Sequence, residues 1–131
     1  MNPYILTLLY FIVAVVIVVV GLIIFELITT KYKDWDEIER GNSAVALSIG
    51  GKIIGICVIL AFSIYNNDTI LSTAIWGGYG VVLQMVAYYL FDFLARKIPI
   101  ESEMKKGNIA VGIISLCVSI GLAFVVGASI T

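Results

Sequence analysis

Four long apolar segments alternate with short polar ones along this chain. They run over residues 3–30, 43–65, 70–95 and 108–130. Each is longer than the roughly 20 residues that an α-helix needs to cross a bilayer. A segment in hydrocarbon must satisfy its own backbone polar groups, which a helix does. The pattern therefore predicts an all-α fold, a polytopic membrane protein with four transmembrane helices.

The polar corners after the first and third apolar segments share one pattern, a charged turn that leads into Gly-Asn. Sixty-six positions separate the corner residues Glu37, Gly41 and Asn42 from Glu103, Gly107 and Asn108. Asn is a preferred N-cap, and Gly suits the sharp turn before it. The chain is therefore expected to contain two copies of a two-helix unit, over residues 1–65 and 66–131.

The basic residues indicate how the helices cross the membrane. Apart from Lys52, they all lie in the two corners: Lys31, Lys33, Arg40, Arg96, Lys97, Lys105 and Lys106. The positive-inside rule then predicts cytoplasmic corners, with both termini outside. Because each unit has an even number of spans, the two units are expected to be parallel and not inverted.

Composition agrees with a membrane protein and argues against several functions. Hydrophobic residues make up 61% of the chain and charged residues 13%, and mean hydropathy is +1.09. The chain has no His, and no motif for an enzyme, a metal, a cofactor or nucleic acid stands out, so none is expected. Cys57 and Cys117 both fall inside apolar segments and are expected to be small buried apolar residues. They lie at different depths, so no disulfide is expected between them within one chain.

Three charged residues lie within the apolar segments and form the candidate buried charge cluster. Lys52 lies ten residues past Asn42, roughly 15 Å along a helix and near mid-membrane. Glu26 and Asp92 lie at equivalent positions, about one turn inside the corner ends of their segments. A charge in hydrocarbon costs about 2.5–3.5 kcal/mol, so Lys52 is expected to face inward and to pair with Glu26 or Asp92. Such a cluster serves either as a structural ion pair or as part of an ion or proton pathway.

Small and polar residues mark the expected helix contacts. Ser48, Gly51 and Gly55 lie on the same helical face as Lys52, where small side chains let helices pack closely. Gln84, in the third segment, is expected to form an interhelical hydrogen bond. Gly77-Gly78-Tyr79-Gly80 has the ending of a potassium filter, but too little span follows it, so a close helix contact or a kink is the preferred interpretation.

The corners and the helix after the first one carry a resemblance to a known family. Both corners read Glu-x-x-x-Gly-Asn, and residues 44–55 read Ala-Val-Ala-Leu-Ser-Ile-Gly-Gly-Lys-Ile-Ile-Gly. This resembles the bacterial membrane family called domain of unknown function 350, whose unit is a two-span module that is often duplicated. The second copy departs from the first, with Leu116, Cys117 and Val118 in place of Gly50, Gly51 and Lys52. The resemblance implies a multi-pass protein of the bacterial plasma membrane and no particular activity.

Two functions remain open. In the first, the protein is a structural or accessory subunit that works as a homo-oligomer in the lipid bilayer and contacts a cytoplasmic or membrane protein partner. In the second, it is an ion or proton channel or transporter that uses the Lys52 cluster. The two differ in whether that cluster is sealed by protein or lines a hydrated cavity.

Overall fold

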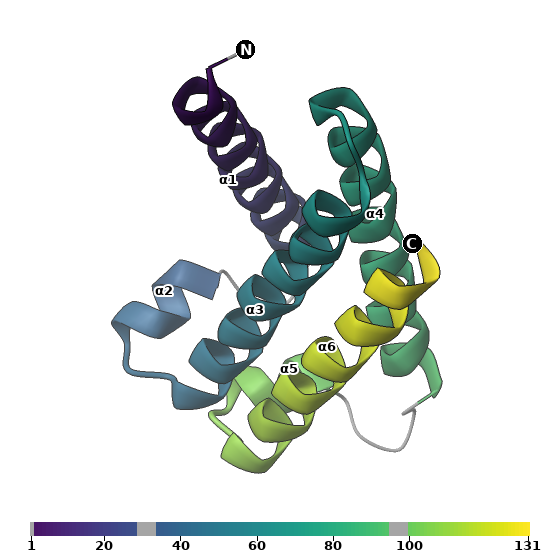
Figure 1. The fold of residues 1–131 in the computed structure, drawn as a ribbon. Coiled ribbons are helices and arrows are strands. Elements are labelled where there is room, and N and C mark those ends of the chain that lie inside the picture. Colours follow the sequence, from purple (N-terminus) through teal and green to yellow (C-terminus); the bar gives the residue numbers. More distant parts are fainter. Residues whose placement is uncertain (1, 29–33, 95–99) are drawn as a thin grey trace.

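The computed structural model describes residues 2–28, 34–94 and 100–131. Its helices are α1 (Pro3–Ile28), α2 (Asp34–Glu39), α3 (Ser43–Asn66), α4 (Ile70–Leu94), α5 (Ile100–Lys105) and α6 (Ile109–Ser129) (Figure 1). The described residues contain no strand, and α1, α3, α4 and α6 are long and apolar enough to cross a membrane. The predicted all-α fold with four spans is confirmed. The corner residues Lys31, Lys33, Arg96 and Lys97 lie outside the described residues.

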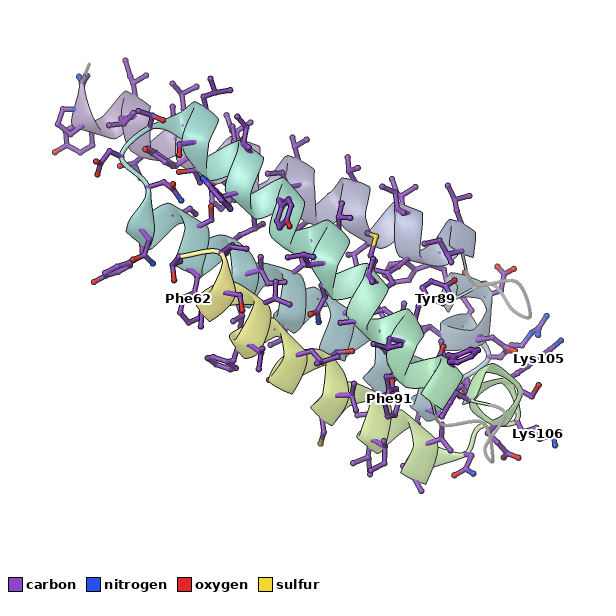
Figure 2. The ribbon with its side chains drawn as sticks, turned by 90° about the vertical axis from the view of Figure 1, so that its right-hand side faces the viewer. Phe62, Tyr89, Phe91, Lys105 and Lys106 are labelled. Atoms are coloured by element: carbon purple, nitrogen blue, oxygen red, sulfur yellow. The ribbon has the colours of Figure 1, made fainter. Side chains whose placement is uncertain are left out.

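The two short helices lie at one end of the bundle, here called the corner end (Figure 1). The N-terminus, the turn between α3 and α4 and the C-terminus lie toward the other end. Lys105 and Lys106 project from the corner end (Figure 2). Which end faces the cytoplasm stays a prediction.

Helices of the two halves begin and turn at matching positions. Residues 34 and 100 start the short helices, and residues 43 and 109 start the long helices that follow, sixty-six residues apart in each case. Gly41 and Gly107 have φ of 81° and 82°, a conformation that favours glycine. The hydrogen bonds around them also match, since the Gly41 amide donates to Ile38 and the Gly107 amide to Met104, both at 2.9 Å. The division into two repeats stays an interpretation, which this agreement supports.

α3 occupies the middle of the bundle and packs most extensively on α6 (Figure 1). Two glycines allow the close approach: a Cβ on Gly112 would lie 2.7 Å from the Ala44 carbonyl oxygen, and one on Gly51 would lie 2.8 Å from the Leu116 Cα. Further along the helices, Gly127 lies against Phe62. The contacts advance in step along both helices, so α3 and α6 are parallel neighbours.

α4 runs without a break through the Gly77–Gly80 segment. Gly77 lies against Leu60, and Gly80 against Ile59, so closely that any Cβ there would come within 2.7 Å and 2.6 Å of those side chains. These glycines therefore bring α4 against α3. Of the two interpretations preferred over a filter, the close helix contact is confirmed.

α1 packs on α3 and α4 along one side and leaves most of its surface exposed, including Phe11 and Leu27. In a membrane, exposed apolar side chains of this kind face lipid or another protein chain. Cys57 and Cys117 are also exposed, and both are free thiols. The prediction that these cysteines are buried was wrong, because each lies on the side of its helix that turns away from the α3–α6 contact.

Candidate functional site

Lys52 lies in the interior of the bundle, where two aromatic side chains flank it. The residue is 3% exposed. Its Nζ lies 5.1 Å from the ring centroid of Phe25 on α1 and 5.1 Å from that of Tyr88 on α4. The two rings meet edge to face, with centroids 6.0 Å apart. An ammonium over aromatic faces gains about 2 kcal/mol when it is desolvated, so the rings stabilise the charge on Lys52.

A first layer of hydroxyl groups joins three helices one turn closer to the corner end. The Tyr88 hydroxyl lies 2.6 Å from Ser115 Oγ, and Ser115 Oγ lies 3.2 Å from Ser48 Oγ. All three residues are buried. Because buried polar groups are costly unless they are hydrogen-bonded, this chain of hydroxyls fixes α3, α4 and α6 relative to one another.

A second polar layer lies one helical turn beyond the hydroxyl layer, on the side away from the corner end. Gln84 Nε2 donates to the Ser119 carbonyl oxygen at 2.7 Å, the predicted interhelical hydrogen bond. Gly55 makes room for it, since a Cβ there would lie 3.1 Å from both Gln84 Nε2 and that carbonyl oxygen. Gln84 Oε1 and Ser119 Oγ are buried without a hydrogen-bond partner in the described protein. Such atoms cost about 1–3 kcal/mol each unless water reaches them.

The two acidic residues of the predicted cluster lie near the corner end. Glu26 and Asp92 are each half-buried, and Asp92 Oδ1 is buried. Glu26 directly follows Phe25, and Asp92 lies one turn after Tyr88, so both acids follow the aromatic residues that flank Lys52. A pairing of Lys52 with either acid stays a prediction.

The two Gly-Asn corners differ in their side-chain contacts. Asn42 Oδ1 accepts from the Val45 amide at 3.2 Å and so caps α3, as predicted, and Asn42 Nδ2 donates to the Met104 carbonyl oxygen at 2.8 Å. Asn108 also takes the N-cap position but makes no side-chain cap bond to the helix. Its Nδ2 donates to Glu103 Oε2 at 3.2 Å instead. The predicted capping bond of Asn108 is therefore wrong in this structure.

Corner acids also pair with nearby basic side chains. Glu37 is buried, and its Oε2 lies 3.4 Å from Arg40 Nη1. Glu103 Oε1 lies 3.9 Å from Lys106 Nζ. The basic partner is exposed in both pairs, and ion pairs at the surface contribute little to stability, about 0–1 kcal/mol each. Elsewhere in the described residues, no three His, Cys, Asp or Glu side chains are grouped in a way that would hold a metal ion.

Sequence reasoning identified Lys52, Gln84 and the helix-packing residue Ser48 but missed the aromatic side chains that flank Lys52. Phe25 and Tyr88 are ordinary residues for an apolar helix, so their types carried no signal. One signal was available in their spacing: Gln84, Tyr88 and Asp92 recur every fourth residue, as do Ser48 with Lys52 and Ser115 with Ser119. This spacing places each set on one helical face.

Comparison with known proteins identifies the family. A model of the family described as Domain of Unknown Function (DUF350) matches residues 1–130. The chain belongs to this family. The DUF350 match covers both halves of the chain, including the polar layers and both corners.

Two curated relatives of this DUF350 protein are membrane proteins of bacteria. The chain is similar to the UPF0719 transmembrane protein YshE of Bacillus subtilis (strain 168), with 45% identity over 92% of this chain and 90% of the relative. It is also similar to the UPF0719 inner membrane protein YjfL of Escherichia coli (strain K12), with 29% identity over 60% of this chain and 59% of that protein. No solved structure shows a significant match. The DUF350 chain is thus a membrane protein, and its relatives' names give no activity.

Proposed function

We propose that this DUF350 protein is a structural or accessory subunit of the bacterial cell membrane, works as an oligomer and is not an enzyme. The observation that carries the proposal is the position of Lys52. Its ammonium lies against two aromatic rings, and the polar layers around it use their groups to join helices. This arrangement supports a role for the buried polar groups in holding the bundle together.

The half of the α3–α6 contact that lies away from the corner end also favours a sealed bundle. Beyond the second polar layer, α3 and α6 meet through the buried apolar cluster Ile59, Ala123, Val126 and Ile130. Apolar side chains packed at interior density leave little room for water or ions. A path that entered at the corner end would therefore stop near the middle of a single chain.

A second candidate function, an ion or proton pathway, is favoured by Gln84 Oε1 and Ser119 Oγ. Both atoms are buried and unsatisfied by the described protein, and water is the usual partner of such groups. Hydration at this point, beside Gly55 and so three residues along α3 from Lys52, would be the first requirement of a pathway.

Flux measurements on reconstituted protein separate the two candidates. Vesicles that hold the purified protein and a pH-sensitive dye are given a potassium gradient with valinomycin, and proton entry is recorded. A structural subunit predicts the same flux as protein-free vesicles, for both the wild type and Lys52→Met. A wild-type flux well above that background, lost in Lys52→Met, would favour the pathway and overturn the structural proposal. Native mass spectrometry of the protein in nanodiscs tests the oligomer, and a monomer alone would contradict that part.

A further inference from the structure

We infer that a second copy of this chain packs against the exposed face of α6 and meets it with the exposed face of its own α3. The contact repeats, from one chain to the next, the α3–α6 interface within each chain. The inference rests on the proposed oligomer and names the surfaces that build it.

The first step is that α3 and α6 meet through opposite faces. α3 contributes Ala44, Ser48, Gly51 and Gly55, while α6 contributes Gly112, Ser115, Ser119 and Ala123. Subtracting sixty-six from each α6 residue number gives its equivalent position on α3. These positions mostly fall two residues after the residues that α3 itself contributes. Two residues turn a helix by about 200°. Equivalent helices that meet through different faces form a heterologous contact, which leaves one face of each free to continue the series.

The second step is that both free faces are exposed and contain small residues. On α6, the positions equivalent to the α3 contact set are Ala110, Ile114, Cys117, Gly121 and Val125, all exposed. On α3, the positions equivalent to the α6 contact set are Ala46, Ile49, Ile53 and Cys57. Ile49 is buried in its own chain, whereas the other three are exposed or half-buried, as are Gly50 and Ala61 beside them. A Cβ on Gly50 or on Gly121 would meet nothing within 4 Å. Gly121 is the equivalent of Gly55, which the internal interface buries.

Apolar grooves adjoin these free faces and give the third step. Between α4 and α6, a groove of about 470 Å³ is lined by Ala87, Leu90, Phe91, Val118, Gly121 and Leu122, and Phe91 is labelled in Figure 2. Val118 and Gly121 are equivalent to Lys52 and Gly55, which Tyr88 and Gln84 of α4 cover inside the chain. A neighbouring copy would cover the groove in the same way with its α1.

The residues that would enter this groove match its chemistry. The α1 equivalents of Gln84 and Tyr88 are Val18 and Leu22. Both are half-buried because they pack in part against the apolar cluster around Phe25 and Ile56 of their own chain, so a neighbouring copy would meet only their exposed portions. Val118 stands in place of the charged Lys52. Apolar residues thus stand at the proposed contact where Lys52, Gln84 and Tyr88 stand inside the chain. An interface without a buried charge requires this.

The other side of the proposed contact has a groove as well. A groove of about 340 Å³ between α1 and α3 includes Phe11, Ala14, Cys57 and Ala61. Their equivalents are Gly77, Gly80, Ala123 and Gly127, of which the three glycines lie against Leu60, Ile59 and Phe62 of α3. A neighbouring α6, which is the equivalent of α3, would fill this groove.

The difference between the two corners agrees with this arrangement. Inside the chain, Asn42 Nδ2 donates to the Met104 carbonyl oxygen in the next half. The equivalent bond would run from Asn108 to the Ile38 carbonyl oxygen of the next copy. Asn108 is exposed and free to turn from its own Glu103 toward such a partner.

Disulfide cross-linking tests the interface at one pair of atoms. The Cβ built on Gly55 lies 3.4 Å from the Ala123 Cβ, close to the separation of about 3.8 Å in a disulfide. The equivalent pair between copies is Gly121 of one chain and Cys57 of the next. In a Cys117→Ala background, Gly121→Cys should therefore oxidise in membranes to a ladder of covalent oligomers with the native Cys57. The new side chain meets open space in its own chain, so folding should be unaffected.

Controls keep the result specific. A tagged chain that carries only Cys57 and an untagged chain with Cys57→Ala, Cys117→Ala and Gly121→Cys should form only mixed dimers when they are coexpressed. Val82→Cys is the matched control, because residue 82 is exposed at a similar depth on α4, and its cross-linking should be at least tenfold weaker. Equal cross-linking by Val82→Cys, dimers of the Cys57-only chain, or no Gly121 product would each overturn the interface. An oligomer seen by native mass spectrometry without the Gly121 cross-link would leave the proposed function standing and this interface wrong.

Discussion

At the scale of single residues, the neighbouring helices supply partners for the Lys52 ammonium and for the amide nitrogen of Gln84. Lys52 lies against aromatic rings, and the Gln84 amide donates to a backbone carbonyl on α6. Neither arrangement needs a ligand. Asn42 likewise uses both ends of its side-chain amide, because its oxygen accepts from a helix amide and its nitrogen donates to a carbonyl of the other corner.

The corner asparagines should therefore differ when they are replaced. Asn42→Ala loses an N-cap and a link between the corners, and should lower the free energy of unfolding by about 1–2 kcal/mol. Asn108→Ala loses only an exposed bond to Glu103 and should change it by less than about 0.5 kcal/mol. Urea unfolding of the two variants in the same mild detergent measures the difference. Equal losses would mean that the link from Asn42 to Met104 contributes nothing.

At the scale of elements, the apolar pattern was enough to predict the long helices and both corner turns. Period and length alone reveal a membrane helix, and Gly before Asn reveals the turn. The partner of each helix was not predictable in this way. Gly112, for instance, lies against Ala44, sixty-eight positions earlier in the chain. Tertiary packing decides which residues of two helices come into contact, and it also decides that the side of α3 with Cys57 is exposed.

The α3–α6 contact should be the least tolerant of added bulk. Gly112→Leu places a side chain where the Ala44 backbone lies within 2.8 Å, so it should lower the unfolding temperature by well over 5 °C through overpacking. Gly78→Leu is the matched control, since a Cβ there meets nothing within 4 Å, and it should have little effect. Thermal unfolding of both variants in detergent checks this. If the Gly112 variant were as stable as the control, α3 and α6 would not pack as closely as the structure has them.

At the scale of the whole molecule, the protein is a bundle whose corner end contains two short helices and basic side chains (Figure 2). Its interior has two polar layers near the middle and an apolar α3–α6 contact beyond them, and at the far end the buried Ser63 Oγ donates to the Thr73 carbonyl oxygen at 2.8 Å. The placement of the charges predicted the basic corners and the buried Lys52. Ser48 was predicted at a helix contact, but its link through Ser115 to Tyr88 was not, because tyrosine occurs in apolar helices for many reasons.

The orientation of the bundle in the membrane is predicted from the same placement of charges. In a chain with Cys57→Ala and Cys117→Ala, a cysteine in place of Asp68 should react with a membrane-impermeant maleimide added to intact cells. A cysteine in place of Lys106, which is exposed at the corner end, should react only after the membrane is opened. The reversed pattern would contradict the predicted cytoplasmic corners.

The central claim is that Lys52 holds the bundle together. The measurement that tests it most directly compares the stability of a variant that lacks Lys52 with that of a variant that lacks both Lys52 and its acidic partner. If Lys52 braces the bundle by pairing with Glu26 or Asp92, Lys52→Met should strand a carboxylate and lower the free energy of unfolding by about 3–5 kcal/mol. Lys52→Met combined with Glu26→Gln or with Asp92→Asn, whichever acid is the partner, should then recover a substantial part of that loss. Unfolding of the two variants in the same lipid environment gives both numbers. Equal stability of the single and double variants would contradict the account.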